Sequence, residues 1–219
     1  MIGTPPPVAS TPRIFLLSPA NLGGERAALL TSPRAAFPLA ARVRSRAGAP
    51  LGEVMSFLSG LYFRGKLAYG LAFAAPPSPR CPGVLVITPD RGLQPPETSL
   101  TLRTLLAAGR IDIHQANARY RRPLETSALA LARRIGRRCE VVLLGSIASE
   151  KYTAVLGAVF GDRLRFPIDF VGRGDMSRGG LLLRCVAAQR ELPYVPVNGA
   201  VLHGPRPPRL TPLPRRLVP

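Results

Sequence analysis

Three short segments made almost entirely of apolar residues constrain the fold of this chain most. They span residues 13–17, 84–88 and 140–144, and a proline or a glycine follows each of them within two residues. Strands that are apolar along their whole length are typical of parallel sheets, because helices cover both faces of such sheets. We therefore expect a three-layer α/β fold, in which these strands are adjacent and mostly parallel and helices cover both faces of the sheet.

Helical patterns separate the predicted strands. A helix pair is expected over 50–75, an amphipathic helix over 124–138 with Pro123 in its first turn, and further helices over 25–30, 148–160 and 178–190. Two more strands are expected near 163–166 and 194–197. The predicted organisation is a disordered tail at 1–12, a single α/β domain over 13–203 and a Pro/Arg-rich tail at 204–219.

The chain is strongly basic, with 30 Lys and Arg residues against 12 Asp and Glu residues and a net charge of +18. Such a balance favours nucleic acid, a nucleotide or an acidic surface as the partner. Lys66 and Lys151 are the only lysines, however, and all other basic residues are arginines in a chain rich in Ala, Pro and Gly. GC-rich codons produce this profile whatever the function, so the charge alone leaves a polyanion partner and a compositional origin equally open.

The cysteines and the hydropathy pattern argue against a metal site and against a membrane segment. Cys81, Cys139 and Cys185 are far apart, and only His114 and His203 are available to join them. No apolar stretch approaches the roughly 18 residues that a membrane helix requires, and no charged leader opens the chain. We expect a cytoplasmic protein without a metal or a cofactor.

The segment 170–183 is the first candidate for a binding site. It places four glycines and two arginines where an apolar strand is expected to give way to an apolar helix. Glycines let the backbone approach an anion, a helix N-terminus offers free N–H groups, and arginine matches phosphate or carboxylate. The predicted anion-binding residues are Gly172, Arg173, Gly174, Asp175, Ser177, Arg178 and Gly179. The alternative is that Asp175 or Ser177 only caps a helix that begins near Arg178.

Four loops are expected to meet at the carboxyl ends of the predicted strands, where ligands bind in such folds. They span 18–24, 88–93, 145–149 and 172–180. Asp90, in the second loop, is the candidate for a catalytic base, and the alternative is an ordinary Asp-Arg-Gly turn. Ser146, in the third loop, lacks the G-x-S-x-G pattern of a serine nucleophile, so we expect it to begin a helix or to bind a ligand through its backbone.

Two segments mix aromatic residues with cations, a combination that stacks on bases and neutralises phosphates. In 61–69, helical spacing leaves open the alternative that the aromatic residues lie in the core while Arg64 and Lys66 lie outside. In 119–122 the combination precedes a proline and is expected to be more exposed. The residues predicted to contact nucleic acid are Arg119, Tyr120, Arg121 and Arg122.

The order of these segments resembles the uracil-DNA-glycosylase-like α/β domain, including the form attached to archaeal tRNA-guanine transglycosylase relatives. The residues that carry the resemblance are Ser18-Pro19 after the first strand, Val84–Pro89 with Gly92-Leu93, and Val141–Gly145 before a helix. The resemblance covers about residues 13–197 and implies the α/β fold. The loops that hold that family's signatures, of Gly-x-Asp-Pro-Tyr and His-Pro-Ser type, have other residues here, so no catalytic residue and no glycosylase activity are carried over.

Two functional hypotheses follow from the sequence. The first is a protein that binds nucleic acid or a nucleotide through the loop 172–180, with action on a base or nucleoside left open. The second is a non-catalytic α/β binding or scaffold protein whose basic charge is mostly compositional. A polyanion site requires basic residues gathered at the rim formed by the loops, whereas compositional arginine is expected on all faces.

Overall fold

A six-stranded sheet organises the part of the chain that the computed structural model describes, which comprises residues 11–201, 204–208 and 210. The strand order is β4-β3-β1-β6-β7-β8. The inner strands β3 (Val84–Thr88), β1 (Arg13–Leu17), β6 (Glu140–Leu144) and β7 (Leu164–Pro167) are parallel. The edge strands β4 (Gly92–Gln94) and β8 (Tyr194–Pro196) are antiparallel to their neighbours. The predicted adjacency of the three apolar strands is confirmed.

The apolar character of β1 explains its central position. Phe15 pairs with Val84 on one side and with Val142 on the other. Residues 14–17 have no exposed surface, and the same is true of residues 141–144 on β6. Because these strands are buried on both faces, every position stabilises the folded state, by about 25 cal/mol for each Å² of apolar surface removed from water.

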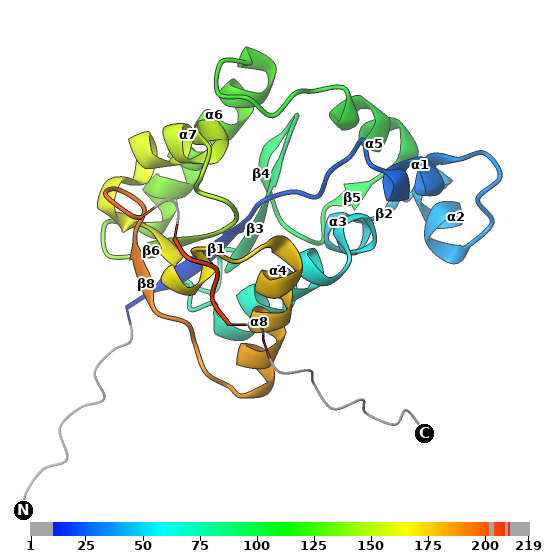
Figure 1. Cartoon of the computed structure of the whole chain (residues 1–219). Helices are drawn as coiled ribbons and strands as arrows, with labels where there is room; N and C mark the ends of the chain where they lie inside the picture. The colour runs from blue at the N-terminus through cyan, green and yellow to red at the C-terminus, as the bar shows by residue number, and fades with distance from the viewer. Residues whose placement is uncertain (1–10, 202–203, 209, 211–219) are drawn as a thin grey trace, which may run out of the picture.

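Helices cover both faces of the sheet, as the sequence predicts (Figure 1). One layer contains α4 (Leu61–Phe73) and α8 (Asp175–Ala187), and the other contains α6 (Ala118–Ile135) and α7 (Glu150–Phe160). The remaining helices, α1 (Glu25–Thr31), α2 (Pro38–Arg44), α3 (Leu51–Ser59) and α5 (Leu102–Gly109), lie to the right of the sheet in Figure 1, with a small ribbon of β2 (Ala49–Pro50) and β5 (Ser99–Leu100). Two 3₁₀ turns, η1 (Gly161–Arg163) and η2 (Ile168–Phe170), flank β7.

Helices α4 and α8 pack against each other at the level of the backbone. A Cβ atom at Gly65 of α4 would lie 2.7 Å from the carbonyl oxygen of Gly179. A Cβ atom at Gly179 of α8 would in turn lie 2.7 Å from the carbonyl oxygen of Leu61. These two glycines therefore allow a close crossing that brings the first turn of α8 beside the first turns of α4.

Two predicted helices begin earlier than the sequence suggested. Helix α6 begins at Ala118, because the Asn117 side chain accepts a hydrogen bond from the Arg119 N–H at 3.1 Å and caps it. Pro123 therefore lies inside the helix rather than in its first turn, and Gly136, with φ +70°, ends the helix before Arg137 and Arg138. Helix α8 begins at Asp175, three residues before the predicted start.

The C-terminal segment contacts the body of the protein where it is described. A Cβ atom at Gly204 would lie 2.7 Å from Val171, and Leu210 lies close to Gly180. The predicted tail at 204–219 is thus packed in its first part, which covers one side of the loop 172–180. The predictions for 1–10 and 211–219 lie outside the described residues.

Candidate functional site at the carboxyl ends of β1 and β6

The loops after β1 and β6 diverge and leave a crevice between them. In the six-stranded sheet, β1 is followed along the chain by β3, which pairs with β1 on the side away from β6. β6 is followed by β7, which pairs with β6 on the side away from β1. Ser18 is the last residue held between the two strands, because its N–H donates to the Leu144 carbonyl at 3.2 Å. Open α/β sheets bind their ligands at such a point, where the strand order reverses.

A small polar pocket of about 230 Å³, here called the inner pocket, opens directly above Ser18. Its polar lining comes from five parts of the chain: Ser18 and Asn21 after β1, Ser59 at the end of α3, Tyr62 on α4, Ser146, Lys151 and Tyr152 after β6, and Asp175 at the start of α8. Three of the four loops that were expected to converge therefore meet here. The fourth, after β3, contributes only Pro89, which lines an adjoining pocket.

Lys66 lies beneath the inner pocket and is almost completely buried, with 1% of its surface exposed. Its Nζ donates to the Ser18 carbonyl oxygen at 2.6 Å and to Ser18 Oγ at 2.8 Å. The same amine lies 4.4 Å from the ring centre of Tyr62 and 5.0 Å from that of Phe63. No carboxylate forms an ion pair with Lys66 among the salt bridges of the described residues.

This environment disfavours the charged form of the amine. Burial lowers the pKa of Lys66 from 10.5 to about 7; Asp175 opposes the shift, while Arg178 and Lys151 add to it. A substantial fraction of the lysine is therefore neutral at physiological pH. A neutral amine can accept a proton, which arginine cannot do in proteins.

The Tyr62 hydroxyl is buried beneath the wall of the inner pocket and lies beside the Arg178 guanidinium. The residue is 6% exposed, and burial raises the pKa of its hydroxyl to about 12. The group therefore remains protonated.

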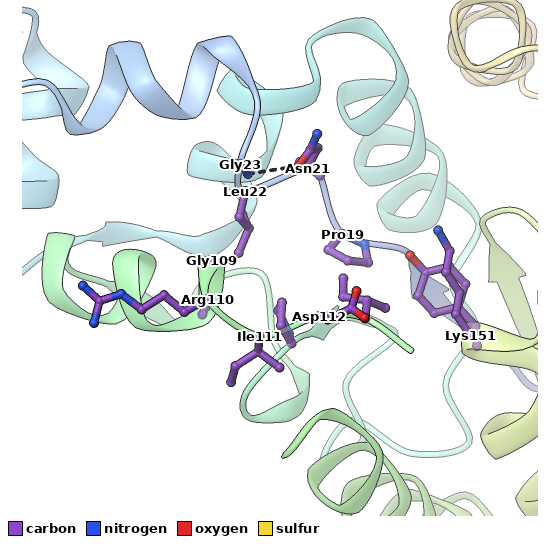
Figure 2. Close-up of a pocket in the computed structure, with 14 residues that line it drawn as sticks. Pro19, Asn21, Leu22, Gly23, Gly109, Arg110, Ile111, Asp112 and Lys151 are labelled. Carbon is purple, nitrogen blue, oxygen red and sulfur yellow. Dashed lines mark hydrogen bonds between the residues drawn. The ribbon is translucent and has the colours of Figure 1, made fainter. Parts of the chain in front are cut away.

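A larger pocket of about 690 Å³, here called the outer pocket, adjoins the inner one and shares Asn21, Lys151 and Tyr152 with it. Figure 2 shows Asn21, Asp112 and Lys151 around this space, whereas the Arg110 side chain extends away from it. Leu22, Ile111 and Ile113 add apolar surface. Pockets of 300–1,000 Å³ with apolar walls and a few polar groups are typical of small-molecule sites.

Both lysines of the chain contribute to this one crevice. Lys66 lies under the inner pocket, and Lys151 lines both pockets. The arginines, by contrast, are spread over the protein: Arg134 donates to the Arg80 carbonyl, and Arg163 donates to the Gly136 carbonyl, both near the amino ends of strands. Some of the arginines thus lie far from the crevice, whereas both lysines lie at it.

The arginines of the predicted anion loop are engaged with the loop itself. Arg178 donates from Nε and Nη2 to the Phe170 carbonyl, at 3.2 and 3.1 Å, and Arg173 donates to the Asp169 carbonyl at 3.0 Å. Asp175 lies 3.9 Å from Arg178, and neither it nor Ser177 caps α8, whose N-cap is Gly174. The backbone N–H of Arg178 already donates to the Gly174 carbonyl. The backbone N–H groups of the first turn that are left to bind an anion are therefore those of residues 175–177.

Gly172 and Gly179 also have conformational roles. Gly172 has φ +71°, and Gly179 makes the close crossing with α4. The loop still lines a hollow of about 420 Å³ together with the C-terminal segment, where Arg173, Arg184 and Arg206 gather. Anion binding at this loop stays a prediction.

Asp90 lies in the tight turn that joins β3 to β4. Thr88 Oγ1 donates to the Gly92 carbonyl at 2.8 Å and accepts from the Arg91 N–H at 3.2 Å. Asp90 lies 3.5 Å from Arg91 and is outside both pockets. The geometry matches the turn that was the alternative for this segment.

The predicted nucleic-acid segment divides into exposed and buried residues. Arg119, Arg121 and Arg122 are exposed in the first turns of α6. Tyr120 has no exposed surface, and its hydroxyl donates to the Lys151 carbonyl at 2.8 Å. Tyr120 is therefore unable to stack on a base in this structure, and it instead ties α6 to the start of α7 beside the crevice.

The expectation that Lys66 lies outside the core is wrong. Residues 62, 66 and 69 share one face of α4, as their spacing indicates, and that whole face is buried. The amine is tolerated there because Ser18 accepts two hydrogen bonds from it. The signal in the sequence was the rarity of lysine in a chain that otherwise uses arginine.

Comparisons with protein-family models, curated proteins and solved structures find no match for this chain. Within residues 11–201, 204–208 and 210, no group of three or more His, Cys, Asp or Glu residues could hold a metal ion. None of the helices in these ranges is long and apolar enough to span a membrane.

Proposed function

We propose that the crevice after β1 and β6 binds a nucleotide unit, either free or within a single strand of nucleic acid. The observation that carries the proposal is the meeting of Lys66 and Lys151 at one polar crevice. Each lysine in this arginine-rich chain supplies an amine, which differs from a guanidinium in size, hydrogen bonding and pKa. Two such amines at one crevice indicate a site.

The outer pocket has the surfaces that a nucleoside requires. Leu22, Ile111 and Ile113 offer apolar contact to a base, and Asn21 and Asp112 offer hydrogen bonds to a base edge or a ribose hydroxyl. Asn21 Oδ1 already accepts from the Gly23 N–H at 2.9 Å, which fixes the amide and leaves its NH₂ group for a ligand.

The phosphate is expected beside Lys151. This side chain lies in the first turn of α7, where the free N–H groups and the helix dipole favour negative charge. Asp175, with its side chain 72% exposed, is the opposing charge at the inner pocket. We therefore place the phosphate beside Asn21 and Lys151, where the two pockets join, and the nucleoside in the outer pocket.

The exposed arginines of α6 extend this site for a longer ligand. Tyr120 fixes the start of α6 against Lys151, and Arg119, Arg121 and Arg122 are exposed on the same turns, with Arg121 lining a pocket between α6 and α7. They would contact the phosphates of neighbouring nucleotides in a strand, and a free nucleotide would not need them.

A calorimetric titration tests the proposal, with AMP, ATP and a short single-stranded oligonucleotide as ligands. Replacing Lys151 with Gln should weaken binding of each ligand about tenfold to a hundredfold, because one charge-assisted hydrogen bond is worth about 1.5–3 kcal/mol. Arg138→Gln is the matched control, because it removes the same charge from an exposed residue just before β6.

The ligands distinguish the two sources of the nucleotide. Tighter binding of the oligonucleotide that weakens with salt indicates nucleic acid, and equal binding of AMP indicates a free nucleotide. If neither binds, or if Arg138→Gln weakens binding as much as Lys151→Gln, the proposal is wrong. The remaining hypothesis is then the scaffold protein of compositional charge.

A further inference from the structure

Ser18 and Lys66 form a hydrogen-bonded pair at the floor of the inner pocket. Ser18 lines the pocket, whereas Lys66 is 1% exposed and has its Nζ 2.8 Å from Ser18 Oγ. Gly145 makes room for the pair, because a Cβ atom at this position would lie 2.9 Å from the Ser18 Cβ and 3.1 Å from its Oγ. Ser18 Oγ also donates to the Leu144 carbonyl at 3.3 Å, so this bond must break before the serine proton can pass to Lys66.

We infer that Ser18 is a nucleophile, that Lys66 is its general base, and that the inner pocket hydrolyses a carboxylic ester. A serine hydroxyl is a weak nucleophile until an adjacent base removes its proton, and lysine replaces histidine in some serine hydrolases. The inference rests on the proposed function only for the alcohol part of the ester, which would carry the nucleotide. The chemistry of the pair itself needs no nucleotide.

The reaction needs only water as a second reactant. Lys66 Nζ takes the Ser18 proton while Oγ bonds to the ester carbon, and the carbonyl electron pair moves to oxygen. The electron pair on oxygen then restores the carbonyl, the bond between the carbonyl carbon and the alcohol oxygen breaks, and Lys66 gives its proton to that oxygen. Water then attacks the acyl-serine with its proton passing to Lys66, the bond to Oγ breaks, and Ser18 recovers the proton, leaving a carboxylic acid and an alcohol.

The surroundings of the pair match both requirements of this reaction. The base must be neutral at rest, and the pKa of Lys66 is lowered to about 7 by burial, with Arg178 and Lys151 facing it from α8 and α7 and Asp175 opposing them. The oxygen that becomes negative needs a donor or a positive charge near it. Lys151 adds a positive charge at the rim.

A structural role for Lys66 is the competing explanation. Its bond to the Ser18 carbonyl, at 2.6 Å, would hold the turn after β1 whether or not any reaction occurs. That role predicts no reactivity at Ser18. A measurement of reactivity therefore separates the two explanations, whereas a measurement of stability does not.

The test uses a fluorophosphonate, which labels activated serines covalently, and p-nitrophenyl acetate as a neutral ester. We expect the full-length protein to be labelled at Ser18, located by peptide mass spectrometry, at a rate that rises with pH around a midpoint of about 7. Ser18→Ala should abolish labelling. Lys66→Arg and Lys66→Met should slow it at least a hundredfold, since general bases contribute about 10²–10⁴ in rate. Ser56→Ala, outside the pockets and buried in part on α3, is the control and should match wild type.

Each outcome decides the inference. Absence of Ser18 labelling between about pH 6 and 10 overturns it, as does unchanged labelling in a folded Lys66→Met variant. If both Lys66 variants fail to fold, the wild-type profile decides, and a flat profile or a midpoint near 10.5 overturns it. Labelling of Ser18 without nucleotide binding would support the Ser18–Lys66 pair and reject the proposed function. Nucleotide binding without labelling would support the proposed function and reject the pair.

Discussion

The crossing of α4 and α8 gives a stability prediction that can be worked from the structure. Replacing Gly65 with Ala would place a Cβ atom 2.7 Å from the Gly179 carbonyl oxygen and 3.0 Å from its Cα. Both neighbours are backbone atoms, so the clash is relieved only by moving a helix. Overpacking of this kind costs about 1–3 kcal/mol, and we expect the upper end because no flexible side chain can yield.

Alanine also favours the helix by about 1 kcal/mol over glycine, which offsets part of that cost. The expected net loss for Gly65→Ala is therefore roughly 2 kcal/mol. Gly157→Ala is the matched control, because Gly157 lies inside α7 and its added Cβ would meet nothing within 4 Å. That variant should gain about 1 kcal/mol.

Urea unfolding of the three proteins measures these differences directly. The two variants should lie on opposite sides of wild type, separated by roughly 3 kcal/mol. The same separation of helices would move Lys66 away from Asp175, so Gly65→Ala should also weaken ligand binding at the crevice. A Gly65→Ala variant as stable as Gly157→Ala would refute the close crossing.

Three further predictions concern charged residues. Between about pH 7.5 and 9.5, the free energy of unfolding of wild type, measured with urea, should rise by roughly 2–3 kcal/mol relative to that of Lys66→Met. The reason is that Lys66 is neutral in the folded protein above its pKa of about 7 but stays protonated in the unfolded chain up to about pH 10.5. A constant difference would contradict this, and Arg64→Met is the control. Arg178→Ala should lose about 1.5–3 kcal/mol of stability through its bonds to the Phe170 carbonyl, and unchanged thermal unfolding would speak against that structural role. If an oligonucleotide binds, replacing Arg119, Arg121 and Arg122 with Gln should reduce the slope of log K against log salt by about 0.7–0.9 for each phosphate that is no longer neutralised, and an unchanged slope would mean that these arginines are only solvated.

Strands β1, β3, β6, β7 and β8 and most helices could be predicted from the sequence, mainly because their apolar pattern coincides with burial, whereas the short strands β2, β4 and β5 were missed. Residues 13–17, 84–88 and 140–144 are apolar almost throughout, and the structure pairs them as expected. Helices α2 and α5 were missed although each has a local signal, Pro38 at the start of the first and the Thr101–Thr104 capping box of the second. Short helices of this kind depend on contacts that a periodic pattern does not contain.

The candidate site was less predictable than the fold. Its rim position follows from strand order, but the partner of Ser18 comes from residue 66, which is far away in sequence. The spacing of Lys66 placed it on the same helix face as the buried tyrosines. Because lysine is seldom fully buried, however, its residue type favoured a position at the surface. The composition of the loop 172–180 predicted an anion site. In the structure its two arginines, Arg173 and Arg178, donate hydrogen bonds to backbone carbonyls just before the loop.

The two lysines allow the central claim to be measured directly. In a protein labelled with ¹³C at lysine Cε, the untagged chain gives signals from Lys66 and Lys151 only. We predict that one signal titrates with a midpoint of about 7, that Lys66→Met removes it, and that AMP or the oligonucleotide shifts both signals. Two signals that titrate near 10.5 and do not respond to either ligand would contradict the claim that the lysines form one ligand site.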